Sequence, residues 1–119
     1  MPRSCLCFVI FPHEPAPFLR NGTIMNDHDV NKVAGLLKTM AHPIRLKILC
    51  LLQDREMTVG ELRDEVKTTN ANVSQHLTIL RHKDIISFRK DANFIFNKIA
   101  DPRIIELMAT MKKTFCPDE

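Results

Sequence analysis

The sequence predicts a mainly α-helical domain with one small β-hairpin, its elements following the order α-α-α-α-β-β-α. Apolar residues recur at three- and four-residue spacing in five segments, and the period changes to two between Ile86 and Ile99. The chain has 119 residues, 45% of them hydrophobic and 26% charged, which suits one soluble globular domain with its own core. We therefore expect a single folded domain over residues 25–119.

The first 24 residues differ in character from the rest. Four of the seven prolines lie in the first 17 residues, and no helical or alternating period runs through this stretch. We expect an N-terminal extension over residues 1–24, either disordered or translated from a misplaced upstream start. The apolar run from Cys5 to Phe11 is short for a signal peptide, and prolines follow it. No run is long enough to span a bilayer, so we expect a cytoplasmic protein with reduced thiols.

Two helices open the predicted domain. The first begins at Asp27 and carries one amphipathic stripe, formed by Val30, Val33, Leu37 and Met40. The second begins at Pro43, because proline suits the first helical position, where its missing N–H group is not needed. Only Arg45 and Lys47 interrupt the apolar residues of IRLKILCLL. We therefore expect the second helix to be enclosed on most sides, at the centre of the core.

A helix-turn-helix follows. Thr58 and Glu61 have the spacing of a capping box, which predicts the start of the helix VGELRDEV. A polar turn follows, and Thr69 is placed to cap the next helix, expected over Ala71 to Lys83. The buried stripe of that helix is expected to comprise Val73, Leu77 and Leu80. The pattern predicts two helices joined by a tight turn.

The remaining elements are a hairpin and a last helix. Ile86 and Phe88 alternate with polar residues, and Asp91-Ala92-Asn93 then turns the chain into a second strand, FIFNKI. Asp101 as a cap and Pro102 as the first residue open the last helix. Its apolar stripe has near-heptad spacing, through Ile104, Met108, Met111 and Phe115. The complete order is that of a winged helix-turn-helix.

In a helix-turn-helix, the second helix enters the DNA major groove and its polar side chains reach the base edges. Amide, guanidinium and hydroxyl groups suit that contact, and they lie opposite the buried stripe at Asn70, Ser74, Gln75, Thr78 and Arg81. Arg89 and Lys90, near the hairpin tip, are expected to contact phosphate or the minor groove. From Lys67 to Lys98 there are six Lys or Arg and two Asp, whereas Asp54 to Val66 holds five acids and two Arg. We therefore expect double-stranded DNA as a partner.

Two further interpretations concern this region. A polar helix face and a basic hairpin are, taken singly, more often solvated surface than a DNA contact. His76 flanks the buried stripe, so we expect it to pack or hydrogen-bond inside rather than to read a base.

The narrow apolar stripes of the first and last helices predict a homodimer. They would be unusually exposed on so small a domain unless another surface covered them. A symmetric partner would place two reading helices about one DNA turn apart, on a palindromic operator. The alternative is that the two helices cover each other within one chain.

The segments LLKTMAHPIRLKILCLL, TVGELRDEV and NVSQHLTILR, with the Phe-rich hairpin, resemble the ArsR/SmtB repressors over Val30 to Cys116. The resemblance implies a winged-helix dimer that represses operons and releases DNA when a metal or a thiol-reactive inducer binds. Metal-sensing members carry Cys-x-Cys in the helix where this chain has Arg63 and Glu65, or Asp and His on the last helix, which here has no His. We therefore expect no metal site of these types and no cofactor. Cys5-Leu6-Cys7 supplies two soft ligands without identifiable partners.

The resemblance also gives Cys50 and Cys116 a role. By themselves they read as a small core residue and an idle terminal thiol. The pattern ILC in the second helix with FC at the end of the last resembles the dithiol branch, the SqrR- and BigR-like repressors that sense persulfides and other reactive sulfur. This implies a redox-sensing pair bridged by a disulfide or by extra sulfur atoms, which span a wider gap. Lys112 and Lys113 are expected to favour the Cys116 thiolate, making it the first nucleophile.

Two alternatives remain open from the sequence. One is an ArsR-type repressor that responds to a metal, a peroxide or another inducer, with the cysteine pair incidental. The other is a thiol enzyme that uses Cys50 or Cys116 as its nucleophile. We do not expect an enzyme, because the chain has no Cys-x-x-Cys pair, no Gly-rich phosphate loop and no obvious His with an acidic orienter beside either cysteine.

Overall fold

The computed structural model describes residues 24–117 of the chain. The chain divides into two compact units, residues 1–34 and residues 35–119, and the boundary falls inside helix α2 (Asp27–Met40). The predicted extension over residues 1–24 lies outside the described residues, apart from Ile24, and so do Cys5 and Cys7.

In the first unit, α2 begins at Asp27, as the sequence predicts. The Asn26 side chain accepts a hydrogen bond of 2.8 Å from the backbone N–H of Asp29. Asp27 and Asp29 place negative charge in the first turn, where the helix dipole favours it. Val30, the first residue of the predicted apolar stripe, is 43% exposed.

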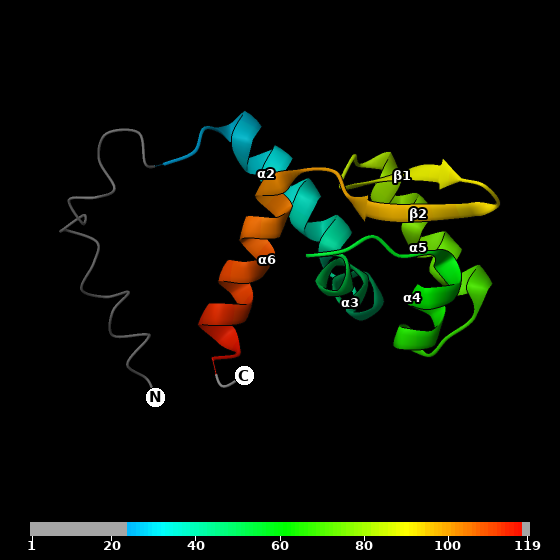
Figure 1. Cartoon of the computed structure of the whole chain (residues 1–119). Coiled ribbons are helices and arrows are strands. Elements are labelled where there is room, and N and C mark those ends of the chain that lie inside the picture. Colours follow the sequence, from blue (N-terminus) through cyan, green and yellow to red (C-terminus); the bar gives the residue numbers. More distant parts are fainter. Residues whose placement is uncertain (1–23, 118–119) are drawn as a thin grey trace, which may run out of the picture. The chain divides into compact units, whose positions relative to one another are not determined.

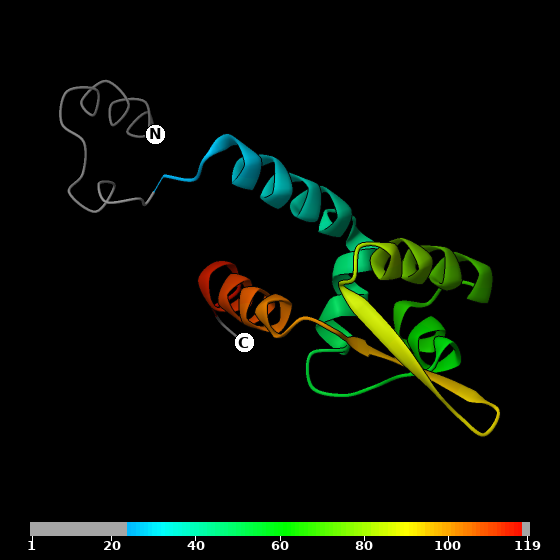
Figure 2. The same ribbon diagram turned by 90° about the horizontal axis from the view of Figure 1, so that it is seen from above.

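The described residues have the predicted element order, and Figures 1 and 2 show the arrangement of the second unit. Helix α3 lies between α6 on one side and the pair α4 and α5 on the other, and the hairpin projects beyond α5. The bounds are α3 Pro43–Leu51, α4 Val59–Val66, α5 Asn70–His82, β1 Ile86–Asp91, β2 Phe94–Ile99 and α6 Pro102–Phe115. Observed helix α5 begins and ends one residue before the predicted bounds.

Side chains at the helix starts explain where the helices begin. Thr58 and Glu61 form the predicted capping box, each side chain bonded to the other's backbone N–H at 3.2 and 2.9 Å. Thr69 accepts from the backbone N–H of Asn72 at 3.1 Å, and Asp101 accepts from that of Arg103 at 2.9 Å. These caps satisfy backbone donors that the first turn of a helix leaves without partners.

The core of the second unit forms where α3, α4 and α5 meet. The predicted stripe of α5 is confirmed, because its three apolar residues are 0% exposed. Leu62 of α4 and Ile48 and Leu49 of α3 are also fully buried. The predicted enclosure of α3 is confirmed in part: Ile48 and Leu49 are fully buried and three further apolar residues pack half-buried against the core, but Cys50 is exposed. A run of apolar residues predicts that a helix is buried. It does not show which side of the helix stays exposed in a single protomer.

Strands β1 and β2 pair antiparallel, from Ile86 opposite Ile99 to Asp91 opposite Phe94. Ala92, in the turn, has φ 57°, a left-handed conformation that L residues with a Cβ adopt at a cost. The expected alternation holds for buried Ile86 but not for Phe88, which is 52% exposed and lies under the guanidinium of Arg81. Among the residues that the structure describes, no helix is long and apolar enough to cross a membrane.

Candidate DNA-binding face and thiol site

The exposed face of α5 carries four of the five predicted reading residues. Ser74, Gln75 and Thr78 are exposed, opposite the buried stripe. The Thr78 hydroxyl donates to the backbone carbonyl of Ser74 at 2.9 Å, one turn earlier. Asn70, at the start of α5, accepts a hydrogen bond of 3.1 Å from the Arg63 guanidinium of α4. The face therefore presents amide and hydroxyl groups on a helix whose opposite side is buried in the core.

Arg81 faces the hairpin rather than the open side of α5. Its Nη2 donates to Oδ1 of Asn97 at 2.9 Å, and its guanidinium carbon lies 4.7 Å from the centre of the Phe88 ring. Asn97 is 0% exposed and donates through Nδ2 to the backbone carbonyl of Met57 at 3.2 Å. This buried chain of polar contacts fixes α5 relative to both strands. Arg81 is thus placed to position the reading helix.

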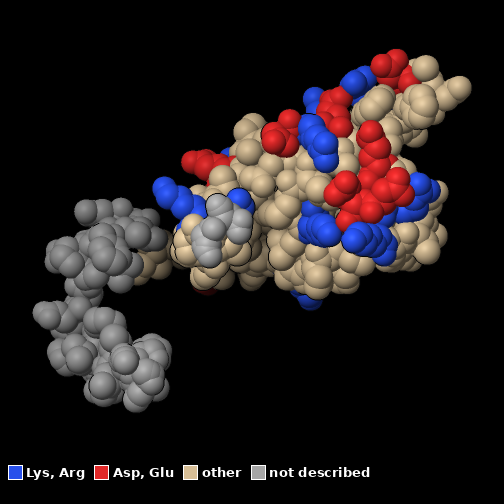
Figure 3. Space-filling model, turned by 60° about the horizontal axis from the view of Figure 1, so that its bottom comes forward, with Lys and Arg blue, Asp and Glu red and all other residues tan. Residues whose placement is uncertain are grey.

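The hairpin arginine is also engaged. Nε and Nη2 of Arg89 each lie 2.8 Å from Oε1 of Glu56, and Nη1 lies 3.5 Å from Oδ2 of Asp91. The hydrogen bond from Arg89 is the main cause that lowers the pKa of Glu56. Lys90 beside it is exposed. Figure 3 shows acidic and basic side chains intermingled on the face it presents, so this face has no uniform basic patch.

His76 of α5 packs against α3, as expected. Its ring centroid lies 4.5 Å from that of His42, and Nη1 of Arg45 lies 3.5 Å from its Nδ1. Burial is the main cause that lowers the pKa of His76, and the charges of His42 and Arg45 add to it. His42 also caps α3, accepting from the backbone N–H of Ile44 at 3.1 Å. The neutral imidazole is the form that this contact between α3 and α5 favours.

The two thiols of the described chain lie at the C-terminal ends of α3 and α6. Cys50 and Cys116 are both free and exposed. The pKa of Cys50 is raised, chiefly because neighbouring groups partly shield its sulfur from water although the residue as a whole is exposed. The charge of Lys112 lowers this pKa and that of Cys116 raises it. Both groups of α6 therefore act electrostatically on the thiol of α3.

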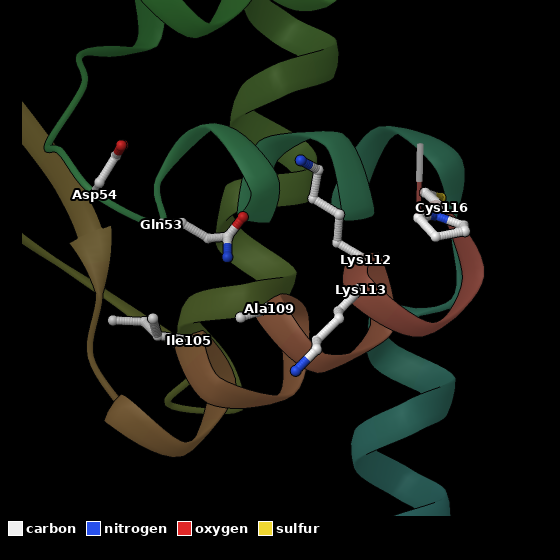
Figure 4. Close-up of a pocket in the computed structure, with 8 residues that line it drawn as sticks. Gln53, Asp54, Ile105, Ala109, Lys112, Lys113 and Cys116 are labelled. Carbon is white, nitrogen blue, oxygen red and sulfur yellow. The ribbon is translucent and has the colours of Figure 1, made fainter. Parts of the chain in front are cut away.

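A pocket of about 610 Å³ lies beside Cys116, where α6 passes the end of α3. Figure 4 shows Lys112 extending from α6 towards α3 and Lys113 extending the other way, with the Gln53 amide on the side of both that faces Asp54. The lining residues are Gln53, Asp54, Ile105, Ala109, Lys112, Lys113, Cys116 and Pro117. Within residues 24–117, no three His, Cys, Asp or Glu side chains come together as a metal site requires.

Comparison with known proteins decides the family. The model for bacterial regulatory proteins of the arsR family matches residues 42–87. The chain is 35% identical over 89 residues to the biofilm growth-associated repressor of Xylella fastidiosa, covering 75% of this chain and 78% of that repressor. It is 33% identical over 104 residues to the transcriptional activator HlyU of Vibrio cholerae, covering 84% and 95%. The chain belongs to the ArsR family.

Solved structures of ArsR-family relatives share its fold. Reduced HlyU from Vibrio cholerae superposes with a TM-score of 0.71 at 32% identity, covering 75% of this chain and 94% of that one. The transcriptional repressor BigR from Xylella fastidiosa gives 0.70 at 33% identity, covering 77% and 98%. The chain is therefore a winged-helix, DNA-binding transcription regulator, and these relatives are regulators rather than enzymes.

Two groups of functional residues in this ArsR-family chain were not predicted from the sequence. Asn97 occupies a buried position of the alternating strand, two residues before buried Ile99, and this placement was the available signal for a polar link in the core. Gln53 and Asp54 follow α3 and join the pocket only through the fold, so no spacing in the sequence marks them.

Proposed function

We propose that this ArsR-family chain is a transcription repressor that senses reactive sulfur species and leaves its operator when Cys50 and Cys116 are bridged. One observation carries the proposal: Cys50 and Cys116 are free, exposed thiols at the C-terminal ends of α3 and α6, and one pocket brings Cys116 together with the residues that follow α3. Two of the similar solved structures support the proposal. BigR is a transcriptional repressor, and HlyU has been solved in its reduced form.

The proposed chemistry needs a low-molecular-weight persulfide, RSSH. The Cys116 thiolate attacks the terminal sulfur of RSSH, the S–S bond of the donor breaks, and RS⁻ leaves and takes up a proton. Cys50 reacts with a second donor in the same way. The deprotonated terminal sulfur of one protein persulfide then attacks the carbon-bound sulfur of the other, and hydrosulfide leaves. Two protein thiols and two RSSH thus give one trisulfide, two RSH and one H₂S.

The distance between the two thiols and the pKa of Cys50 determine the type of bridge and the order of reaction. A disulfide requires Cα atoms within about 7 Å, whereas a trisulfide spans a wider gap, so the separation of the thiols selects the oxidant. The raised pKa of Cys50 leaves less of it as the reactive thiolate near neutral pH, which favours first attack by Cys116.

A bridge reaches DNA through the contacts of α3. Helix α3 packs against α4 and α5, so a covalent tie from α3 to α6 restrains the element that supports the reading helix. We propose that the protein acts as a homodimer on a palindromic operator, as the exposed apolar residues Leu37 of α2 and Phe115 of α6 suggest. A hundredfold loss of affinity needs only about 2.7 kcal/mol of difference between the two states.

Operator binding by variants in which one of the two cysteines is replaced tests this function. The assay is fluorescence anisotropy with DNA from the region upstream of the protein's own gene. Cys50→Ser and Cys116→Ser should each bind this DNA as tightly as wild type does. After persulfide treatment both variants should keep that affinity. The Cys5→Ser/Cys7→Ser variant is the matched control and should still release DNA. Release by either single variant under persulfide would refute the switch. Release of wild type by zinc or peroxide alone would favour the alternative in which the pair is incidental.

A further inference from the structure

The pocket beside Cys116 has the size and charge of a binding site for a small ligand. Its volume of about 610 Å³ falls within the range usual for small-molecule sites. It is far larger than a diatomic sulfur anion needs. Its wall combines two cations, Lys112 and Lys113, with one acid, Asp54, and one amide, Gln53. The reactive sulfur of Cys116 is part of the same wall, so a ligand bound here lies against a nucleophile.

We propose that this pocket binds the sulfur donor itself, and that the donor is an amino-acid or peptide persulfide carrying carboxylates and an ammonium group. This inference rests on the function proposed above. The two lysines meet carboxylates, and Asp54 meets the ammonium group. In Figure 4, Asp54 and Cys116 lie at opposite ends of the lining, so the donor lies across the pocket with its persulfide at the Cys116 end. Two lysines and one aspartate give the lining a net charge of one positive unit. This charge favours a donor of net negative charge.

The two lysines have separable roles. The charge of Lys112 lowers the pKa of Cys50, so this lysine affects the thiols as well as the ligand. Lys113 lines the pocket and is not among the groups that shift that pKa. A change at Lys113 therefore tests recognition of the donor without directly changing the reactivity of Cys50.

The experiment measures how fast Cys116 is persulfidated in the full-length Cys50→Ser protein, followed by peptide mass spectrometry. Glutathione persulfide is the charged probe and 2-mercaptoethanol persulfide the neutral one, each normalised to its rate with a free thiol. Lys113→Gln should slow the reaction with the charged probe about two- to fivefold, the range that an exposed ion pair supplies, and leave the neutral probe unchanged. Added salt should remove the preference for the charged probe. Lys90→Gln, an equal change of charge on the hairpin, should affect neither rate.

The outcomes distinguish the two proposals. Equal normalised rates for both probes in the Cys50→Ser protein, or an equal slowing of both by Lys113→Gln, would overturn the donor assignment while leaving the sulfur switch intact. If neither persulfide modifies Cys116 and wild-type protein stays on its operator, the proposed function itself fails.

Discussion

At the residue scale, Asn97 and Arg81 form the buried link between the reading helix and the hairpin. Asn97→Ala leaves the Arg81 guanidinium without its acceptor and removes one of the two hydrogen bonds that the Met57 carbonyl accepts from Asn97, so the free energy of unfolding should fall by about 2 kcal/mol. Urea denaturation measures this loss. In a double-mutant cycle with Arg81→Met, the double variant should lose about 1 kcal/mol less stability than the sum of the two single variants, because the two residues share one contact. Strict additivity would show that the link contributes nothing.

His76 gives the protein a pH-dependent stability. Its folded-state pKa is lowered, chiefly by burial, so the unfolded chain takes up a proton that the folded chain resists. Stability should therefore be unaffected by this residue well above pH about 6.5 and should fall as the pH drops below that value. Thermal unfolding between neutral and mildly acidic pH would reveal the slope. His76→Gln should flatten it, whereas His82→Gln, an exposed change on the same helix, should not.

At the element scale, the hairpin turn contains a conformational cost that glycine would relieve. Ala92 has φ 57°, where a Cβ is unfavourable, so Ala92→Gly should raise the free energy of unfolding by about 1 kcal/mol. Ala109→Gly, within the exposed face of α6, should instead lower it by about 1 kcal/mol. Chemical denaturation of both variants measures the two changes. A destabilising effect of Ala92→Gly would mean that the turn does not impose this backbone conformation.

The helices and the hairpin could be predicted from the sequence because their signals are local. The Thr58–Glu61 capping box, the Thr69 and Asp101 caps and the stripe of α5 each depend on residues a few positions apart. Side-chain direction could not be predicted in the same way. Arg81 lies on the polar side of its helix, yet it turns to Asn97, sixteen residues away. The exposure of Cys50 likewise depends on where α6 passes α3, which no local spacing specifies.

At the scale of the whole molecule, the exposed apolar residues of α2 and α6 predict a dimer. Leu37 is 46% exposed and Phe115 is 78% exposed, which suits burial against a second copy. Analytical ultracentrifugation should find a dimer for the full chain, and Leu37→Glu should shift it towards monomer and weaken operator binding together. Lys38→Gln, next to it on α2, is the control and should remain dimeric. A wild-type monomer that binds its operator fully would contradict this assembly.

The central claim is that a bridge between Cys50 and Cys116 within one protomer is what releases DNA. The most direct test measures both quantities on the same sample as glutathione persulfide is added: the fraction of protein carrying the Cys50–Cys116 link, by mass spectrometry of linked peptides, and the fraction still bound to operator. We predict that the bound fraction declines in step with the rise of the linked fraction, and that reduction removes the link and restores binding. Full linkage with unchanged DNA affinity, or full release with no link, would contradict it.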